Sequence, residues 1–300
     1  MDSRSLYRRL ELDFNLKDMK DDWSFMSLDN DFIFPEFKSR YMGLVADNTE
    51  HIRKVYTATF PDKAVIDEIF RRNETDVLLF AHHAMEYIAS DEGFPFHDIT
   101  LDYLKEMKKR RISFYMLHTP LDQYGEYSTS VSLAKALGLR IAEPFCRYDE
   151  HTQAGVICRT DMSSVLELQD LVSRTVGHDT KLYPYGEPSI KDGRVAIAAG
   201  GGSYPFVITE LAQKDVHCYI TGFTKPLPHF EPTLAFHRLA RDHGVNVIGA
   251  THYSTEKFAC MAMTGYFAKA GVPAEFLEGT WYLERSEERR VGKECRAMCR

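Results

Sequence analysis

The sequence predicts an α/β protein made of two modules, each with a mainly parallel sheet. Apolar runs of strand length alternate with helical segments of about 10–15 residues. These alternations fall into two clusters, roughly residues 40–145 and 190–280. Several runs are continuously apolar, as in strands that are buried on both faces of a parallel sheet. A chain of 300 residues is long enough for one large domain or two ordinary ones.

The first cluster begins after a polar and aromatic segment, residues 1–40, in which we expect one or two helices. Pro61 marks the start of the first clear helix, and Gly138 closes the last one. The predicted strands are 40–47, 55–60, 76–83 and 112–119, and the predicted helices are 61–72, 101–110 and 132–139.

The second cluster follows a polar middle section to which we assign no element. Its predicted strands are 194–203, 216–222 and 245–253, and its predicted helices are 205–214, 234–244 and 255–271. We therefore expect a first module at 1–145 and a second at 146–283, whose C-terminal helix packs on the first. Residues 284–300 hold 10 charged residues in 17 and no core pattern, so we expect a basic tail that is disordered or not native.

The composition excludes some classes of protein. The formal net charge of -7 argues against nucleic acid as a partner, because binding to phosphates needs a basic face. No apolar stretch is long enough to span a membrane, and the N-terminus lacks the apolar core of a secretory signal. We therefore expect a cytoplasmic protein. None of the six cysteines forms a C-x-x-C pair, so we expect reduced and mostly buried thiols.

Two adjacent histidines, His82 and His83, directly follow a continuous apolar run. In α/β sheets, ligands bind beyond the carboxyl ends of the strands, so this is a place where sites form. In a regular strand the two rings would point to opposite faces, but a turn past the strand end would bring both to one cavity. The alternative is that one ring packs in the core while the other is solvated.

Two further strand ends carry a histidine and a carboxylate four residues apart. They are "HTPLD", with His118 and Asp122, and "THYSTE", with His252 and Glu256. We expect Ser254 or Thr255 to cap the helix that follows His252. The alternatives are a capping Asp122, a glutamate that only complements the helix dipole, and histidines without a ligand role.

Taken together, these six residues suit a pair of metal ions. Four histidines, one aspartate and one glutamate are too many for one catalytic zinc, which uses three protein ligands. Two divalent ions about 3.5–4 Å apart, bridged by a carboxylate, would use them all. Imidazole and carboxylate ligands suit zinc, iron, manganese, cobalt or nickel, and the choice stays open.

A glycine run, "AAGGGSYPF" at 198–206, lies between a predicted strand and a predicted helix. Its backbone N–H groups could hold an anion. Alternatively, the glycines only allow a tight turn. Pro205 occupies the third glycine position of a dinucleotide fingerprint, so we do not expect a dinucleotide site.

The ordered set "AHHA", "HTPLD", "GGGS", "YITG" and "THYSTE" resembles the Nif-three-like family, also called GTP cyclohydrolase I type 2 homologues or dinuclear-metal-centre hexameric proteins. The resemblance covers about residues 40–278. It implies two α/β/α modules with a dinuclear metal site between them, and a ring-like homohexamer. The metal ligands that it implies are His82, His83, Asp122, His252 and a bridging Glu256. It makes His118 a candidate ligand or catalytic proton-transfer group.

This sequence departs from the family pattern at two places. Ala84 stands where the family usually has proline, and "QYGEYST" replaces the usual Gly-x-Asn stretch after "HTPLD". The ligand positions are intact, so metal binding is expected. The altered neighbourhood leaves the substrate open.

The expected function is that of a metal-dependent hydrolase, in which activated water attacks a nucleotide-like or phosphorylated small molecule. His118 would move a proton, because an imidazole can do so near neutral pH. One alternative is a metal-binding or regulatory protein without turnover. The other is a ring-forming protein whose zinc, iron or manganese ions only stabilise the assembly.

Overall fold

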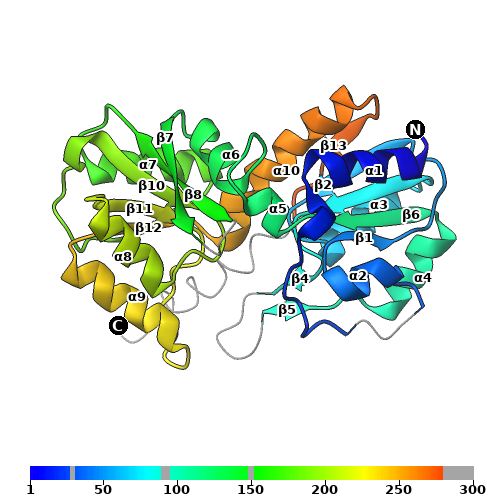
Figure 1. Cartoon of the computed structure of the whole chain (residues 1–300), viewed down its shortest axis with the longest axis horizontal. Helices are drawn as coiled ribbons and strands as arrows, with labels where there is room; N and C mark the ends of the chain where they lie inside the picture. Colours follow the sequence, from blue (N-terminus) through cyan, green and yellow to red (C-terminus); the bar gives the residue numbers. More distant parts are fainter. Residues whose placement is uncertain (28–30, 89–94, 148–151, 280–300) are drawn as a thin grey trace, which may run out of the picture. The chain divides into compact units, whose positions relative to one another are not determined.

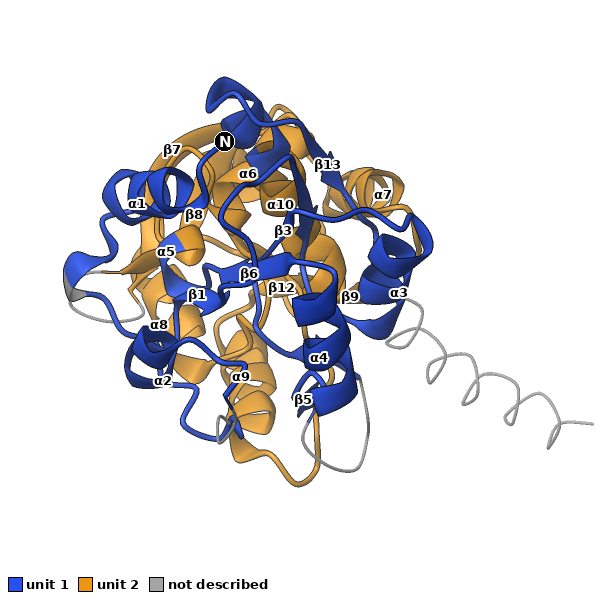
Figure 2. Ribbon diagram, turned by 90° about the vertical axis from the view of Figure 1, so that its right-hand side faces the viewer, with its two compact units in different colours: residues 1–120, 263–300 blue, residues 121–262 orange. Residues whose placement is uncertain are grey.

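The computed structural model describes residues 1–27, 31–88, 95–147 and 152–279, which form two compact units. Unit 1 comprises Met1–Pro120 and the chain from Met263 onward, and unit 2 is Leu121–Ala262 (Figure 2). The prediction of an α/β protein is confirmed. Unit 1 ends before the expected boundary at residue 145, because the next strand pairs within the sheet of unit 2. The expected tail, 284–300, lies outside the described residues.

The sheet of unit 1 has the order β1-β6-β3-β2-β13. Figure 1 labels β1, β2, β6 and β13 of this sheet. The pairs β6–β3, β3–β2 and β2–β13 are parallel, and β1 is antiparallel to β6. Strands β3 and β6 are buried along their whole length, as their continuous apolar runs predict. The strands are β1 (Gly43–Ala46), β2 (Lys54–Ala58), β3 (Val77–Ala81), β6 (Ile112–Met116) and β13 (Ala274–Phe276).

The helices of unit 1 include two α-helices in residues 1–40, where one or two were expected. They are α1 (Ser3–Asp13), the short 3₁₀ turn Leu16–Asp18, α2 (Pro35–Arg40), α3 (Lys63–Arg71) and α4 (Leu101–Lys109). The start of α3 is fixed by Asp62, whose carboxylate accepts a hydrogen bond from the Val65 N–H at 3.0 Å. A small ribbon of β4 (Glu86–Tyr87) and β5 (Phe96–His97) lies apart from the main sheet.

The last strand of unit 1, β13, is tied to the sheet by an ion-pair cluster. Glu275 accepts hydrogen bonds from Arg72 and Lys54, each at 2.8 Å. Hydrogen bonds from Arg72, and then from Lys54, lower the pKa of Glu275 to about 2. The cluster joins a strand from the C-terminal part of the chain to β2 and α3.

Unit 2 has a mixed sheet in the order β7-β8-β10-β11-β12-β9. The central pairs β10–β11 and β11–β12 are parallel, and the flanking pairs are antiparallel. The strands are β7 (Arg140–Arg147), β8 (Gln153–Arg159), β9 (Lys181–Tyr183), β10 (Arg194–Ala198), β11 (Cys218–Thr221) and β12 (Asn246–Gly249).

Both faces of the unit 2 sheet are covered, because successive strand residues pack into two different cores. On β10, Val195 and Ile197 belong to a cluster with residues of α6 (Thr129–Ala136) and α7 (Val165–Val176). Ala196 and Ala198 belong to a second cluster, with α8 (Pro205–Gln213) and α9 (Glu231–Asp242). Unit 2 is therefore an α/β/α sandwich, the layering that the family resemblance implies.

The polar middle section contains elements that the sequence analysis did not assign, namely β7, β8, α7 and β9. Three predicted strand ends were also wrong. The strand expected at 194–203 ends at Ala198. The strand expected at 112–119 ends at Met116, and a short helix, α5 (Thr119–Asp122), follows. The strand expected at 245–253 ends at Gly249, and α10 (His252–Lys269) begins at the histidine itself. The hydroxyl of Thr251, not that of Ser254 or Thr255, accepts the capping hydrogen bond, from the Ser254 N–H.

No described helix combines the length and the apolar character needed to cross a membrane. Four cysteines in the described ranges are buried, namely Cys146, Cys158, Cys218 and Cys260. Burial raises the pKa of Cys146, Cys158 and Cys218 to about 12. Because the thiolate is the reactive form, these thiols are chemically protected in the folded protein.

We expect Cys146, Cys158 and Cys218 to resist iodoacetamide in the folded protein and to react once it is unfolded in guanidinium. Mass mapping of labelled peptides measures each position separately, so other cysteines do not interfere. Equal labelling rates in the folded and unfolded protein would contradict the buried placement.

Candidate metal centre

The three histidines of unit 1 are brought together by the register of two parallel strands. β3 and β6 are neighbours, and their last residues, Ala81 and Met116, are paired. His82 and His83 directly follow β3, and His118 comes two residues after β6. All three side chains therefore start from the same carboxyl edge of the sheet.

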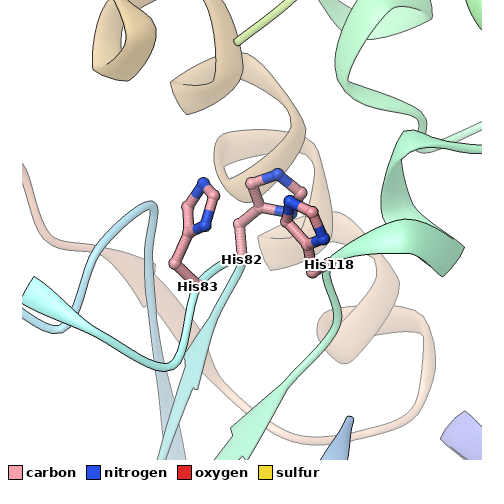
Figure 3. Close-up of side chains that lie close together, drawn as sticks. All are labelled: His82, His83 and His118. Carbon is pink, nitrogen blue, oxygen red and sulfur yellow. The ribbon is translucent and has the colours of Figure 1, made fainter. Parts of the chain in front are cut away.

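The rings of these histidines form a compact cluster (Figure 3). The ring centroids lie 4.4 Å apart for His82 and His83, 5.1 Å for His82 and His118, and 5.0 Å for His83 and His118. One nitrogen of each ring lies within 4.8 Å of the other two. The two adjacent histidines are not on opposite faces, because the strand has already ended at Ala81.

The hydrogen bond of His82 determines which of its nitrogens is available to bind a metal. Its Nδ1 lies 2.9 Å from the carbonyl oxygen of Leu117. A carbonyl only accepts, so Nδ1 carries the hydrogen and the lone pair of the neutral ring is on Nε2. Metal-binding histidines commonly have their second nitrogen held in this way.

Aromatic side chains confine the other two rings. His83 is stacked on Phe60 at 4.2 Å with an interplanar angle of 8°. His118 meets the ring of Trp23 edge to face at 4.8 Å. His82 and His83 are fully buried, whereas the side chain of His118 is 23% exposed. Of the three, His118 is therefore the best placed to exchange a proton with solvent or substrate.

Unit 2 brings together the remaining candidate residues. His252 and Glu256 are one turn apart on α10, and His252 Nε2 lies 3.0 Å from Glu256 Oε1. A carboxylate oxygen of Asp122 lies within 4.8 Å of one of Glu256. The Thr129 hydroxyl donates to Asp122 Oδ1 at 2.8 Å and so holds this carboxylate in place.

Gly200 makes room for the carboxylate of Glu256, which is only 2% exposed. A Cβ atom at Gly200 would collide with Glu256 Oε1 and would stand 3.2 Å from His252 Nε2. The backbone of Gly200 also has a φ of 74°, which a side chain disfavours. A glycine is therefore required at position 200, because the Glu256 carboxylate approaches its Cα closely and because its backbone φ is positive.

At least two N–H groups of the glycine turn donate hydrogen bonds to side chains of neighbouring helices. The Ala199 N–H donates to Ser130 Oγ at 3.1 Å, and the Gly200 N–H donates to Thr255 Oγ1 at 2.9 Å. Neither is aimed at a ligand. The described contacts therefore favour the simpler expectation, a tight turn, over an anion cradle at these two positions.

The sequence of residues 38–280 matches the family Duf34/NIF3 (NGG1p interacting factor 3). The match spans most of the chain. The chain belongs to the Duf34/NIF3 family. The resemblance inferred from the ordered motifs is therefore confirmed.

Curated relatives carry one shared name. A "GTP cyclohydrolase 1 type 2 homolog" of Pyrococcus horikoshii is 31% identical over 242 residues, which are 79% of this chain and 88% of the relative. A protein of the same name from Archaeoglobus fulgidus is 24% identical over 247 residues, 79% of this chain and 88% of that one.

Solved structures of low sequence identity share the fold. The protein ybgI, described as of unknown function, aligns with a TM-score of 0.70 at 20% identity, over 93% of this chain and 98% of its own. TTHA1606 from Thermus thermophilus aligns with a TM-score of 0.65 at 23% identity, over the same shares of the two chains.

Each unit thus gathers three of the six residues that the sequence singled out. Unit 1 holds the three histidines, and unit 2 holds Asp122, His252 and Glu256. That these residues bind metal, and that the two sets form one site, stay predictions. The role of Gly200 could not be predicted from sequence, because nothing local to a glycine run shows which distant side chain approaches it.

We expect Gly200→Ala to displace the Glu256 carboxylate and to destabilise the protein by about 1–3 kcal/mol through its positive φ. The matched control is Gly201→Ala, whose Cβ would meet only His252 Cε1, at 3.9 Å. Urea unfolding and metal content of both variants measure the effects. Equal metal content and stability in the two variants would contradict the close approach.

Proposed function

We propose that the protein is a divalent-metal-dependent hydrolase acting on a small phosphorylated or nucleotide-like molecule. The observation that carries the proposal is the cluster of His82, His83 and His118, whose donor nitrogens lie within 4.8 Å of one another in a largely buried place. The proposed second donor set is Asp122, His252 and Glu256. The two sets would together hold two ions, with Glu256 bridging them.

The chemistry of the donors supports this assignment. Two atoms bound to one ion at about 2.0–2.2 Å each are no more than about 4.4 Å apart, close to the spacing in the histidine cluster. Imidazole nitrogen and carboxylate oxygen are ligands for zinc, iron or manganese. Burying a carboxylate is costly, and a cation beside Glu256 would offset that cost. Gly200 keeps the position of this carboxylate clear.

Divalent ions, when bound, polarise a phosphoryl or carbonyl oxygen and lower the pKa of water. The residues of the chain would then position the reactants. Leu117 fixes the ring of His82 through its carbonyl, and Phe60 limits the rotation of His83. His118 would take up or deliver a proton at the exposed side of the cluster.

The names of the curated relatives make GTP the first compound to test. A cation pair would also help a protein of net charge -7 to bind an anionic substrate. We further propose a homohexamer, as the resemblance implies, and a cytoplasmic location, as expected from the sequence.

We expect about two metal ions per chain in wild type purified without added metal or chelator, the stoichiometry of a two-metal site. Elemental analysis measures this number. His82→Gln and Glu256→Gln should each reduce it, because each removes a proposed ligand. If Glu256 bridges both ions, Glu256→Gln should lose at least as much metal as His82→Gln, which removes a ligand of one ion.

The control for metal content is His243→Gln, which replaces an exposed histidine that follows α9. It should keep the wild-type content. Wild-type protein that takes up no zinc, iron or manganese would eliminate the metal centre. Light scattering before and after chelation tests the alternative in which the ions only stabilise the assembly.

We expect His118→Gln to lower kcat by about 10²–10⁴-fold, the usual contribution of a general acid or base. If His118 only moves protons, the variant keeps its metal, whereas loss of metal would identify His118 as a ligand. Product release from GTP and from phosphate monoesters measures the rate. A metal-loaded wild type that turns over none of these compounds would favour the metal-binding alternative.

A further inference from the structure

The histidine cluster has a neighbour that precedes the matched family region. That region starts at residue 38, whereas Asp21 and Trp23 come earlier in the chain. Both are buried, with relative exposures of 4% and 6%. The N–H of Asp21 donates to the Arg40 carbonyl at 3.0 Å, which anchors this segment within unit 1.

The carboxylate of Asp21 faces His118. Its Oδ1 lies 3.6 Å from His118 Nδ1, within the range of an ion pair and slightly beyond that of a hydrogen bond. The same oxygen accepts a hydrogen bond from the hydroxyl of Thr119, the next residue along the chain. Asp21 therefore contacts two successive residues just past the end of β6.

Asp21 has few groups to compensate its charge. Its second oxygen, Oδ2, is buried and has no hydrogen-bond partner among the described residues. A buried carboxylate with one neutral donor is costly, which gives the neighbouring imidazole a reason to turn an N–H towards it. Trp23 packs edge to face on the same imidazole at 4.8 Å and limits the other orientations of the ring.

We propose that Asp21 is a positioning residue, which holds the hydrogen of His118 on Nδ1 and so presents Nε2 to the histidine cluster. Carboxylates commonly orient metal-site histidines in this way. Presenting Nε2 to the cluster is useful only if the proposed metal centre exists, so this inference rests on the proposed function. The tautomer of His118, however, is a property of the chain alone and is measured without metal.

The first test compares wild type with Asp21→Ala and Asp21→Asn as metal-free proteins carrying ¹⁵N-labelled histidine. At alkaline pH the rings are neutral, and their nitrogen shifts report which nitrogen is protonated. The His118 signal is assigned by its loss in His118→Gln. We expect Nδ1–H in wild type, a shift towards Nε2–H in Asp21→Ala, and an intermediate result in Asp21→Asn.

The second test follows Co²⁺ binding by visible absorption. We expect Asp21→Ala to weaken binding by about 10–100-fold and to change the absorption bands, since carboxylates that orient metal-binding histidines have effects of this size. Asp22→Ala is the matched control, because it removes an exposed carboxylate from the same segment. It should leave both the tautomer and Co²⁺ binding unchanged.

Thr119→Val separates positioning from a purely structural link. It removes the hydrogen bond to Asp21 but leaves the carboxylate facing His118. A tautomer change in Thr119→Val equal to that in Asp21→Ala would overturn the proposal, as would a wild-type tautomer in Asp21→Ala.

If Asp21→Ala fails to fold, a wild-type result in Asp21→Asn overturns it instead. Wild type without Co²⁺ binding would defeat the proposed function, while the tautomer still decides the role of Asp21.

Discussion

The candidate centre depends on the register between neighbouring parallel strands. The pairing of Ala81 with Met116 makes β3 and β6 end at the same level, so the residues after them meet. Unit 2 repeats the arrangement, with Ala198, Thr221 and Gly249 in register at the ends of β10, β11 and β12. A shift of one residue in either sheet would move the donors about 3.3 Å along the strand and turn their side chains over.

The carboxyl ends of these strands also carry polar groups whose burial costs free energy, and the rest of each unit must offset that cost. Full burial of His82 and His83, and near-full burial of Glu256, removes polar groups from water. Local hydrogen bonds, ring stacking and a glycine with a positive φ hold them in place. The apolar strands behind them supply the compensating burial. Such a local conflict is typical of functional sites.

Much of this fold follows from sequence, because continuous apolar runs and helix boundary signals are local. The apolar runs that predicted β3, β6, β10 and β11 all form buried strands. The middle section was missed because its strands are partly exposed. β7, for example, includes Glu143 and Pro144 and lies at the edge of its sheet. The candidate ligands could be predicted because they follow the ends of apolar strands in the sequence. The contact between Asp21 and Thr119 could not, because 98 residues of sequence separate them.

The sheet of unit 1 is completed by a strand that comes after all of unit 2. β13 pairs with β2, and its Glu275 joins Lys54 and Arg72. During synthesis, the chain of unit 2 therefore leaves the ribosome before the last strand of unit 1 does. Until then β2 is an open sheet edge, with the basic side chains of Lys54 and Arg72 beside it. Charged residues on an open edge discourage pairing with other chains, so this pair is placed to protect the nascent sheet until Glu275 arrives.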